Sequence, residues 1–173
     1  MTLVKHSADK VGLDQQENRE VYMLKLSKKM LFAIEAVLDI AYHAGDLPVQ
    51  NRDITRRQDI PRRYLEQALQ QLVHHGILIG VRGPRGGYRL ARERRKISIG
   101  DIVRVVHDME ANDDPNLEGG LSELGTRVVR PMWMKLQTNI MDELDNISID
   151  ELCDNAAKIH IISEGQTNMD FSI

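Results

Sequence analysis

The chain has 173 residues, 42% of them hydrophobic, which is enough for one domain with a buried core. No stretch approaches the roughly 20 consecutive apolar residues that a membrane helix needs, and a single cysteine, Cys153, excludes an intrachain disulfide. We therefore expect a cytoplasmic protein without a membrane segment.

The charge is distributed unevenly along the chain. Residues 1–50 carry a net charge of −1, residues 51–96 carry +8 and residues 97–173 carry −10. A basic middle third beside an acidic last third favours a polyanion-binding module joined to a part that does not bind polyanions. A charged surface that only solvates the protein is the alternative.

The N-terminal part predicts two helices. Residues 1–22 are polar and aperiodic, and we interpret them as a flexible extension. From Ser27 onward, apolar residues recur at spacings of three and four, which predicts an amphipathic helix that Ser27 caps and that ends before Gly45. The residues of its apolar stripe are Leu31, Ile34, Val37, Leu38 and Ala41. A short helix is expected over 51–58, with Ile54 buried.

A third helix and a hairpin follow a short turn. The helix is expected over 62–75 with Gly76 just past its end, and strands over 77–81 and 88–90 flank a glycine-rich turn. The buried stripe of the helix is expected to consist of Tyr64, Leu65, Ala68, Leu69, Leu72 and Val73. Helix, short helix, turn, helix and hairpin are the elements of a winged helix-turn-helix.

The remaining elements are mainly helical. The pattern predicts a fourth helix over 99–107, a loop over 109–126 and a long helix over about 126–144. A short last helix is expected from its cap Ser148 through Cys153. The tail from Ser163 is expected to be loose.

The third helix presents polar side chains in its first turn: Arg62, Arg63, Glu66 and Gln67. In a helix-turn-helix this part of the second helix contacts base edges in the major groove, and these residue types match guanine, adenine and cytosine. The alternative is that these polar side chains are only solvated on the helix surface, but the hairpin that follows the helix favours a contact with DNA.

The hairpin tip carries Arg82, Arg85 and Arg89 among three glycines and a proline. An arginine on a thin wing fits a narrow minor groove, where negative potential is enhanced. A nucleotide-binding glycine loop would lead into a helix instead of a strand. Arg52, Arg56 and Arg57 of the short helix are expected to face phosphates, and the basic residues over 92–96 add non-specific attraction or simply solvate the surface.

The long helix repeats apolar residues at intervals of four, three, four and four. They are Val129, Trp133, Leu136, Ile140 and Leu144. Packing within the chain is one explanation, but a symmetric helix pair is favoured because two-fold DNA sites require two-fold proteins.

The sequence offers no catalytic or metal-binding motif. The six histidines are scattered, and no paired-ligand spacing and no Ser/His/Asp signature is present. We therefore expect no enzymatic activity, no cofactor and no bound metal.

Three segments carry a family resemblance: LSKKMLFAIEAVLDIA, IPRRYLEQALQQLVHHGIL and VRGPRGGYRLAR. They resemble the Rrf-two family of bacterial winged-helix regulators, over about residues 23–155. The resemblance implies a homodimer held by the long helix, major-groove contacts from the third helix and a minor-groove contact from the wing. The residues that it assigns to DNA are Arg63, Tyr64, Glu66, Gln67, Arg82 and Gly83. Arg63 departs from the small residue often found at this position in the family.

The chain departs from the cluster-binding members of that family. By position, their ligands fall near Pro115, Leu121, Arg127 and Arg130, none of which supplies a thiolate or imidazole. Cys153, the only thiol, is expected to pack beyond the long helix, and Asp150, Glu151 and Asp154 would raise its pKa.

We therefore expect a mainly α protein with a small β wing, in which a winged helix-turn-helix domain precedes a long C-terminal dimerisation helix. Its parts are a flexible extension (1–22), a winged-helix DNA-binding domain (23–108), an effector-type loop (109–126), the dimerisation helix with a short final helix (127–162) and a flexible tail (163–173). The expected function is a dimeric repressor that binds double-stranded DNA and answers to an effector protein or small molecule. The alternatives are a cluster- or redox-sensing regulator with unusual ligands (Cys153, a histidine or Glu35) and a winged-helix adaptor for protein interactions.

Overall fold

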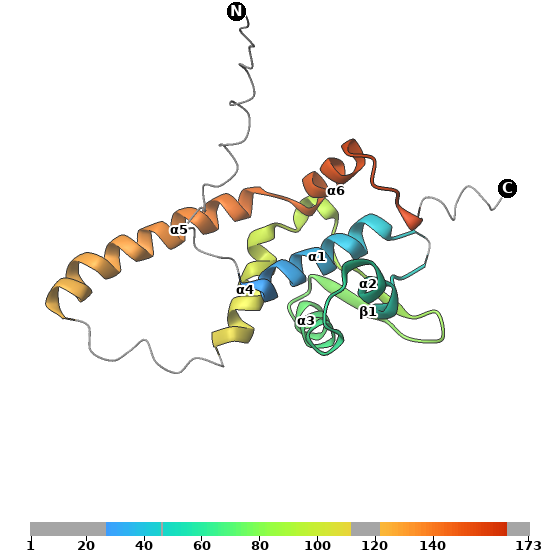
Figure 1. Cartoon of the computed structure of the whole chain (residues 1–173), viewed down its shortest axis with the longest axis horizontal. Coiled ribbons are helices and arrows are strands. Elements are labelled where there is room, and N and C mark those ends of the chain that lie inside the picture. The colour runs from blue at the N-terminus through green and yellow to red at the C-terminus, as the bar shows by residue number, and fades with distance from the viewer. Residues whose placement is uncertain (1–26, 46, 112–121, 166–173) are drawn as a thin grey trace, which may run out of the picture.

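The computed structural model describes residues 27–45, 47–111 and 122–165, and these form helices around one small hairpin (Figure 1). The helices are α1 (Lys28–His43), α2 (Asn51–Gln58), α3 (Arg62–His74), α4 (Ile99–Ala111), α5 (Arg130–Asn146) and α6 (Ile149–Lys158). Strands β1 (Leu78–Val81) and β2 (Gly87–Leu90) pair antiparallel after α3. This order confirms the predicted winged-helix class. The expected extension over 1–22 lies outside the described residues.

Helix α1 is the centre of the core. It contacts α2, α3, α4, α6 and β2, and its side chains Ala33, Ala36 and Ile40 have no exposed surface. Two alanines on this face allow the neighbouring helices to approach closely. The Ser27 hydroxyl accepts a hydrogen bond from the Met30 N–H at 3.1 Å, which confirms the predicted N-cap.

A tight turn joins α2 to α3. Asp59 adopts a left-handed conformation with φ 50°, a conformation that short polar side chains tolerate best among non-glycine residues. Ile54 before the turn and Ile60 within it are buried, so both ends of the turn are anchored in the core. Pro61 is the N-cap of α3.

The hairpin is fixed to the body at its base. Leu78 pairs with Leu90 in its register and is fully buried. Tyr88 also exchanges two backbone hydrogen bonds with Val49, at 3.0 Å and 2.8 Å. A Cβ on Gly87 would lie 2.3 Å from the Val49 carbonyl oxygen, so glycine is required for this approach. The wing is therefore held at a defined position beside α3.

Helix α5 is held at its C-terminal end and projects from the body at its other end (Figure 1). Next to the end of α5, the N–H of Ile149 donates to the Ile97 carbonyl at 2.9 Å. Arg104 of α4 forms a bidentate ion pair with Asp145, with one N···O distance of 2.8 Å. A π-helical turn, η2 (Gly125–Val129), precedes α5.

Helix α4 extends past its predicted end at 107 to Ala111. Met109 packs against the core, and Glu110 accepts a hydrogen bond from the α1 cap at 3.0 Å. Helical structure resumes at Glu123, so the predicted loop over 109–126 is helical at both of its ends.

The C-terminal part also differs from its predicted boundaries. The Ser148 hydroxyl accepts from the Glu151 N–H at 3.1 Å, which confirms the predicted cap of α6. The helix continues to Lys158 beyond the expected end at residue 153. The tail expected to be loose from Ser163 is instead packed as far as Gly165, because Ser163 is only 4% exposed and bonds to the end of α1.

Candidate nucleic-acid interface

The first turn of α3 presents a polar surface. Arg62, Arg63 and Gln67 are exposed and Glu66 is half-buried; their spacing places them on neighbouring parts of one helix face. The Arg62 Nε donates to a Glu66 carboxylate oxygen at 2.9 Å. Guanidinium, carboxylate and amide groups together offer donors and acceptors for base edges.

Tyr64 points in a different direction from these four residues. Its hydroxyl donates to the Lys29 carbonyl at 2.5 Å, and its ring lies 5.9 Å from the ring of Phe32, centroid to centroid. Burial, and secondarily the charge of Glu110, raise the pKa of Tyr64 to about 12. The side chain thus holds α3 against α1, and any contact with DNA would come from its ring.

The hairpin tip exposes Arg82, Gly83 and Arg85. Gly83 has φ 113°, a conformation that favours glycine, and it allows the tight turn that displays both arginines. Arg89 does not join them, because it is half-buried and donates to the Gly45 carbonyl at 3.2 Å. The tip therefore carries two of the three expected arginines.

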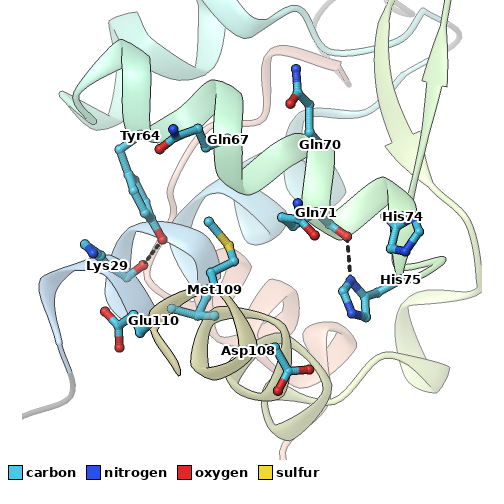
Figure 2. A pocket seen from close by; sticks show the side chains of 11 residues that line it. Lys29, Tyr64, Gln67, Gln70, Gln71, His74, His75, Asp108, Met109 and Glu110 are labelled. Carbon is cyan, nitrogen blue, oxygen red and sulfur yellow. Dashed lines mark hydrogen bonds between the residues drawn. The ribbon is translucent and has the colours of Figure 1, made fainter. Parts of the chain in front are cut away.

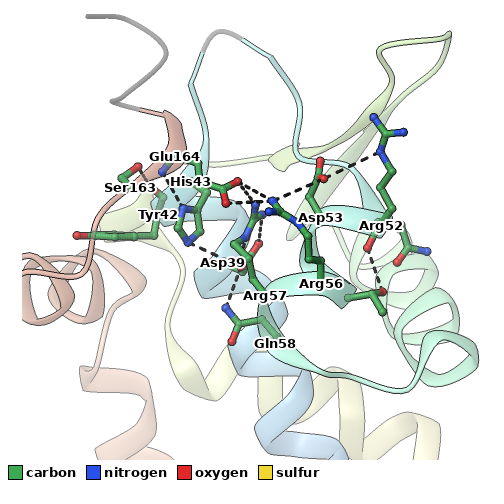
Figure 3. Close-up of polar contacts among 12 residues, drawn as sticks. Asp39, Tyr42, His43, Arg52, Asp53, Arg56, Arg57, Gln58, Ser163 and Glu164 are labelled. Atoms are coloured by element: carbon green, nitrogen blue, oxygen red, sulfur yellow. Dashed lines mark hydrogen bonds and ion pairs between the residues drawn. The ribbon is translucent and has the colours of Figure 1, made fainter.

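The three arginines of α2 have different environments (Figure 3). The side chain of Arg52 is 80% exposed and that of Arg56 is 62% exposed, whereas that of Arg57 is 13% exposed. Arg57 turns inward to the carboxylate of Asp39, and this hydrogen bonding raises the pKa of the guanidinium. The expectation that Arg57 faces a phosphate does not agree with this geometry. Asp39 was not predicted from the sequence as the partner of Arg57. An acidic residue among the apolar positions of α1 was the signal that could have revealed it.

The basic residues over 92–96 are all engaged in ion pairs. Arg92 pairs with Asp101, Arg94 with Asp150, and Arg95 and Lys96 with Glu93. These nearby carboxylates reduce the positive potential of the segment, so its contribution to non-specific attraction is smaller than its composition indicates.

Helix α5 and the last residue of the η2 turn before it carry an exposed apolar stripe. Val129, Trp133, Leu136 and Ile140 are between 39% and 53% exposed. Leu144, at the attached end of the helix, packs against the core. In the described chain nothing covers the first four side chains, and their role in a dimer stays a prediction.

The positions to which the family resemblance assigns cluster ligands do not fit a thiolate-ligated cluster. Arg127 and Arg130 occupy two of the positions, while Pro115 and Leu121 lie outside the described residues. Cys153 is 2% exposed, and burial raises the pKa of its thiol, which disfavours the thiolate that iron requires. Over the described ranges, no group of three or more His, Cys, Asp or Glu residues could hold a metal ion.

A hollow of about 610 Å³ lies between α3 and the end of α4 (Figure 2). Its walls include Gln67 and Gln71 of α3, the C-cap residue His75, and Asp108 and Glu110 of α4. The His75 Nδ1 lies 2.9 Å from the Gln71 carbonyl oxygen. This hollow was not predicted from the sequence because it exists only where the two helices pack together. Met109 and Glu110, the first residues of the predicted effector-type loop, line it.

A basic wing beside the exposed polar face of α3, in this order of helices, defines a winged-helix DNA-binding transcription regulator. The chain belongs to the Rrf2 family, whose model is described as an iron-dependent transcriptional regulator and matches residues 26–155. No helix in the described ranges is both long and apolar enough to cross a membrane.

The chain is similar to named members of this class. It is 39% identical over 140 residues to the HTH-type transcriptional regulator IscR of Vibrio vulnificus, covering 80% of this chain and 82% of the relative. The structure of T. potens IscR matches with a TM-score of 0.63 at 34% identity, over 81% of this chain and 93% of that one. CymR, the global cysteine regulator of B. subtilis, matches with a TM-score of 0.60 at 27% identity, over 77% and 98%.

Proposed function

We propose that this regulator binds a specific operator as a homodimer and represses transcription there, without a thiolate-ligated iron–sulfur cluster. The observation that carries the proposal is the joint exposure of Arg63 and Gln67 on α3 with Arg82 and Arg85 on the wing. Repression follows from occupancy, because a dimer seated on a promoter excludes other proteins from it.

Each element has a separate part in binding. The first turn of α3 enters the major groove, where Arg62, Arg63, Glu66 and Gln67 meet base edges. The wing places Arg82 in the adjacent minor groove, with Gly83 allowing close approach of its backbone. Arg52, at the start of α2, contacts a phosphate and fixes the position of the domain on the duplex.

The dimer forms through α5. Four apolar side chains, including Trp133 and Leu136, are exposed on a helix that projects from the body. Two copies that pack these stripes against each other bury them and place two α3 helices on one duplex.

An effector protein or small molecule controls the operator affinity in this proposal. The hollow between α3 and α4 supports a site next to the predicted effector-type loop, because a ligand there would touch Gln67 on the helix that reads the bases. Iron is not assigned this role because the residues present do not fit a thiolate-ligated cluster.

The wing contact provides the first test. An operator is first selected from random duplexes with the wild-type protein, and its affinity is then measured for Arg82→Ala. We expect a loss of roughly 1–3 kcal/mol in specific binding with unchanged unfolding. Arg95→Ala removes an exposed arginine that is paired with Glu93 and serves as the matched control. Failure of the wild-type protein to select any sequence would refute sequence-specific binding.

A second measurement tests the cluster-free assignment. Protein purified without air is analysed for iron, sulfide and visible absorption from thiolate–iron charge transfer. A colourless, iron-free protein that binds the operator supports the assignment. Stoichiometric iron and sulfide would contradict it and point to unusual ligands, with Cys153 tested first.

A further inference from the structure

The last described residues, 161–165, cross the end of α1 and reach α2; we call them the C-terminal strap (Figure 3). The Ser163 hydroxyl donates to the Tyr42 carbonyl at 2.7 Å, and the Tyr42 hydroxyl donates to the Ile161 carbonyl at 2.6 Å. A Cβ on Gly165 would lie 2.5 Å from the His43 carbonyl oxygen, so only glycine fits there. The strap is therefore closely docked.

Glu164 brings a negative charge from the strap to α2. Its carboxylate accepts hydrogen bonds from Arg56 Nη2 at 3.0 Å and 3.1 Å, and from Arg57 Nη1 at 2.5 Å. Arg57 is already paired with the buried carboxylate of Asp39. Arg56 is the more exposed of the two partners, with its side chain 62% exposed, and its Nη2 also lies 3.9 Å from the Asp53 carboxylate. Of the two guanidinium groups, that of Arg56 is therefore the one that an external anion can reach.

Arg56 stands on the helix that presents Arg52 to the DNA backbone in the proposed function. Residues four apart lie on neighbouring parts of one helix surface, so both side chains reach the same side of α2. A phosphate accepts the same bidentate hydrogen bonds from a guanidinium as a carboxylate does. The Glu164 carboxylate and a DNA phosphate repel each other, so one guanidinium can bind either of them but not both at once.

We propose that Glu164 and a DNA phosphate compete for Arg56, so that the strap lowers the affinity of the protein for DNA. This proposal rests on the proposed function, since it requires α2 to face the DNA backbone. The exchange needs only a side-chain movement, because the Glu164 N–H donates to His43 Nδ1 at 3.1 Å independently of the carboxylate.

The central experiment removes the charge of Glu164 and keeps its shape. We expect Glu164→Gln to bind both the selected operator and an unrelated duplex about two- to fivefold more tightly at low salt, the range of an exposed ion pair. The gain should shrink as ionic strength rises, because salt screens exposed charges. Glu123→Gln, which removes an equal charge from a pair with Arg127 on the turn before α5, should leave affinity unchanged.

Two further variants separate competition from misfolding. Gly165→Ala should displace the strap while all charges remain, and we expect the same gain in affinity. In an Arg56→Gln background, Glu164→Gln should add nothing, since the contested guanidinium is gone. Circular dichroism confirms that each variant is folded.

The outcomes distinguish the two proposals. If the wild-type protein binds DNA and folded Glu164→Gln binds no more tightly, competition at Arg56 is refuted while the proposed function stands. A gain that persists in the Arg56→Gln background also refutes it. If the wild-type protein does not bind duplex DNA at all, both proposals fail.

Discussion

Arg57 donates two hydrogen bonds to the carboxylate of Asp39, one from Nε at 2.8 Å and one from Nη2 at 2.7 Å. The Asp39 side chain has no exposed surface, and Gln58 adds a third hydrogen bond at 2.8 Å. Because a buried carboxylate is tolerated only when it is paired and hydrogen-bonded, these contacts fix α2 on α1. They thereby set the position of Arg52 relative to α3 and the wing.

The first prediction concerns this buried pair. Asp39→Asn keeps the shape of the side chain but leaves Arg57 without its buried counter-charge. We expect the free energy of unfolding to fall by about 3 kcal/mol, the lower end of the range for a broken buried ion pair, because Glu164 still contacts Arg57. Urea denaturation measures the change. Asp142→Asn, an exposed carboxylate on α5, is the control, and equal losses in the two variants would contradict the prediction.

The apolar stripe of α5 gives the second prediction. Leu136→Glu or Ile140→Glu should produce monomers in sedimentation experiments, because each places a charge in the proposed helix pair. Both side chains are about two-fifths exposed in the single chain, so the fold should persist. Thr138→Glu adds the same charge at an exposed position on the opposite face of α5 and should leave the dimer intact. A dimer that survives both substitutions would show that α5 is not the interface.

The third prediction is a pH dependence that arises from His43. Burial is the main cause of its lowered pKa, with the charge of Asp39 opposing the shift, and its neutral ring accepts the Glu164 N–H at Nδ1. The unfolded chain binds a proton at His43 near the ordinary histidine pKa of 6.5, whereas the folded chain does so only at lower pH. Stability should therefore decline as the pH falls below 6.5 and level off below the folded pKa.

Its measurement compares the wild-type protein with His43→Gln. The free energy of unfolding is determined at several pH values on both sides of the ordinary histidine pKa. The other five histidines are common to both proteins, so a smaller slope in His43→Gln isolates this residue. Identical slopes would mean that His43 has the same pKa in the folded and unfolded states.

The fourth prediction concerns Cys153. Because burial raises the pKa of its thiol and only 2% of the residue is exposed, alkylation at neutral pH should be slow in the folded protein and fast in denaturant. Timed labelling followed by mass spectrometry measures both rates. Rapid labelling of the folded protein, with loss of operator binding on oxidation, would instead support the redox-sensing alternative.

The sequence determined the local elements because their signals are local. The Ser27 cap, the interval between α2 and α3 and the glycine-rich turn before Gly87 each depend on neighbouring residues, and their positions agree with the structure. The apolar spacing in α1 predicted the buried face only in part: Val37 and Ala41 are buried as expected, but Leu31 is 43% exposed and the fully buried Ile40 was not in the predicted stripe. The same signals carried the family resemblance, since the matching segments are these elements.

The tertiary structure decided which polar side chains are available. Arg56 and Arg57 are adjacent and chemically identical, yet one is mostly exposed and the other is buried against Asp39, 18 positions earlier. The strap that brings Glu164 to them lies more than 100 positions away in the sequence. Counting charges along the sequence cannot reveal these ion pairs, because an ion pair depends on the distance between two groups in space. The sequence thus determined the winged-helix fold and its basic third, and only the packing of α1, α2 and the strap decided which arginines are free to meet DNA.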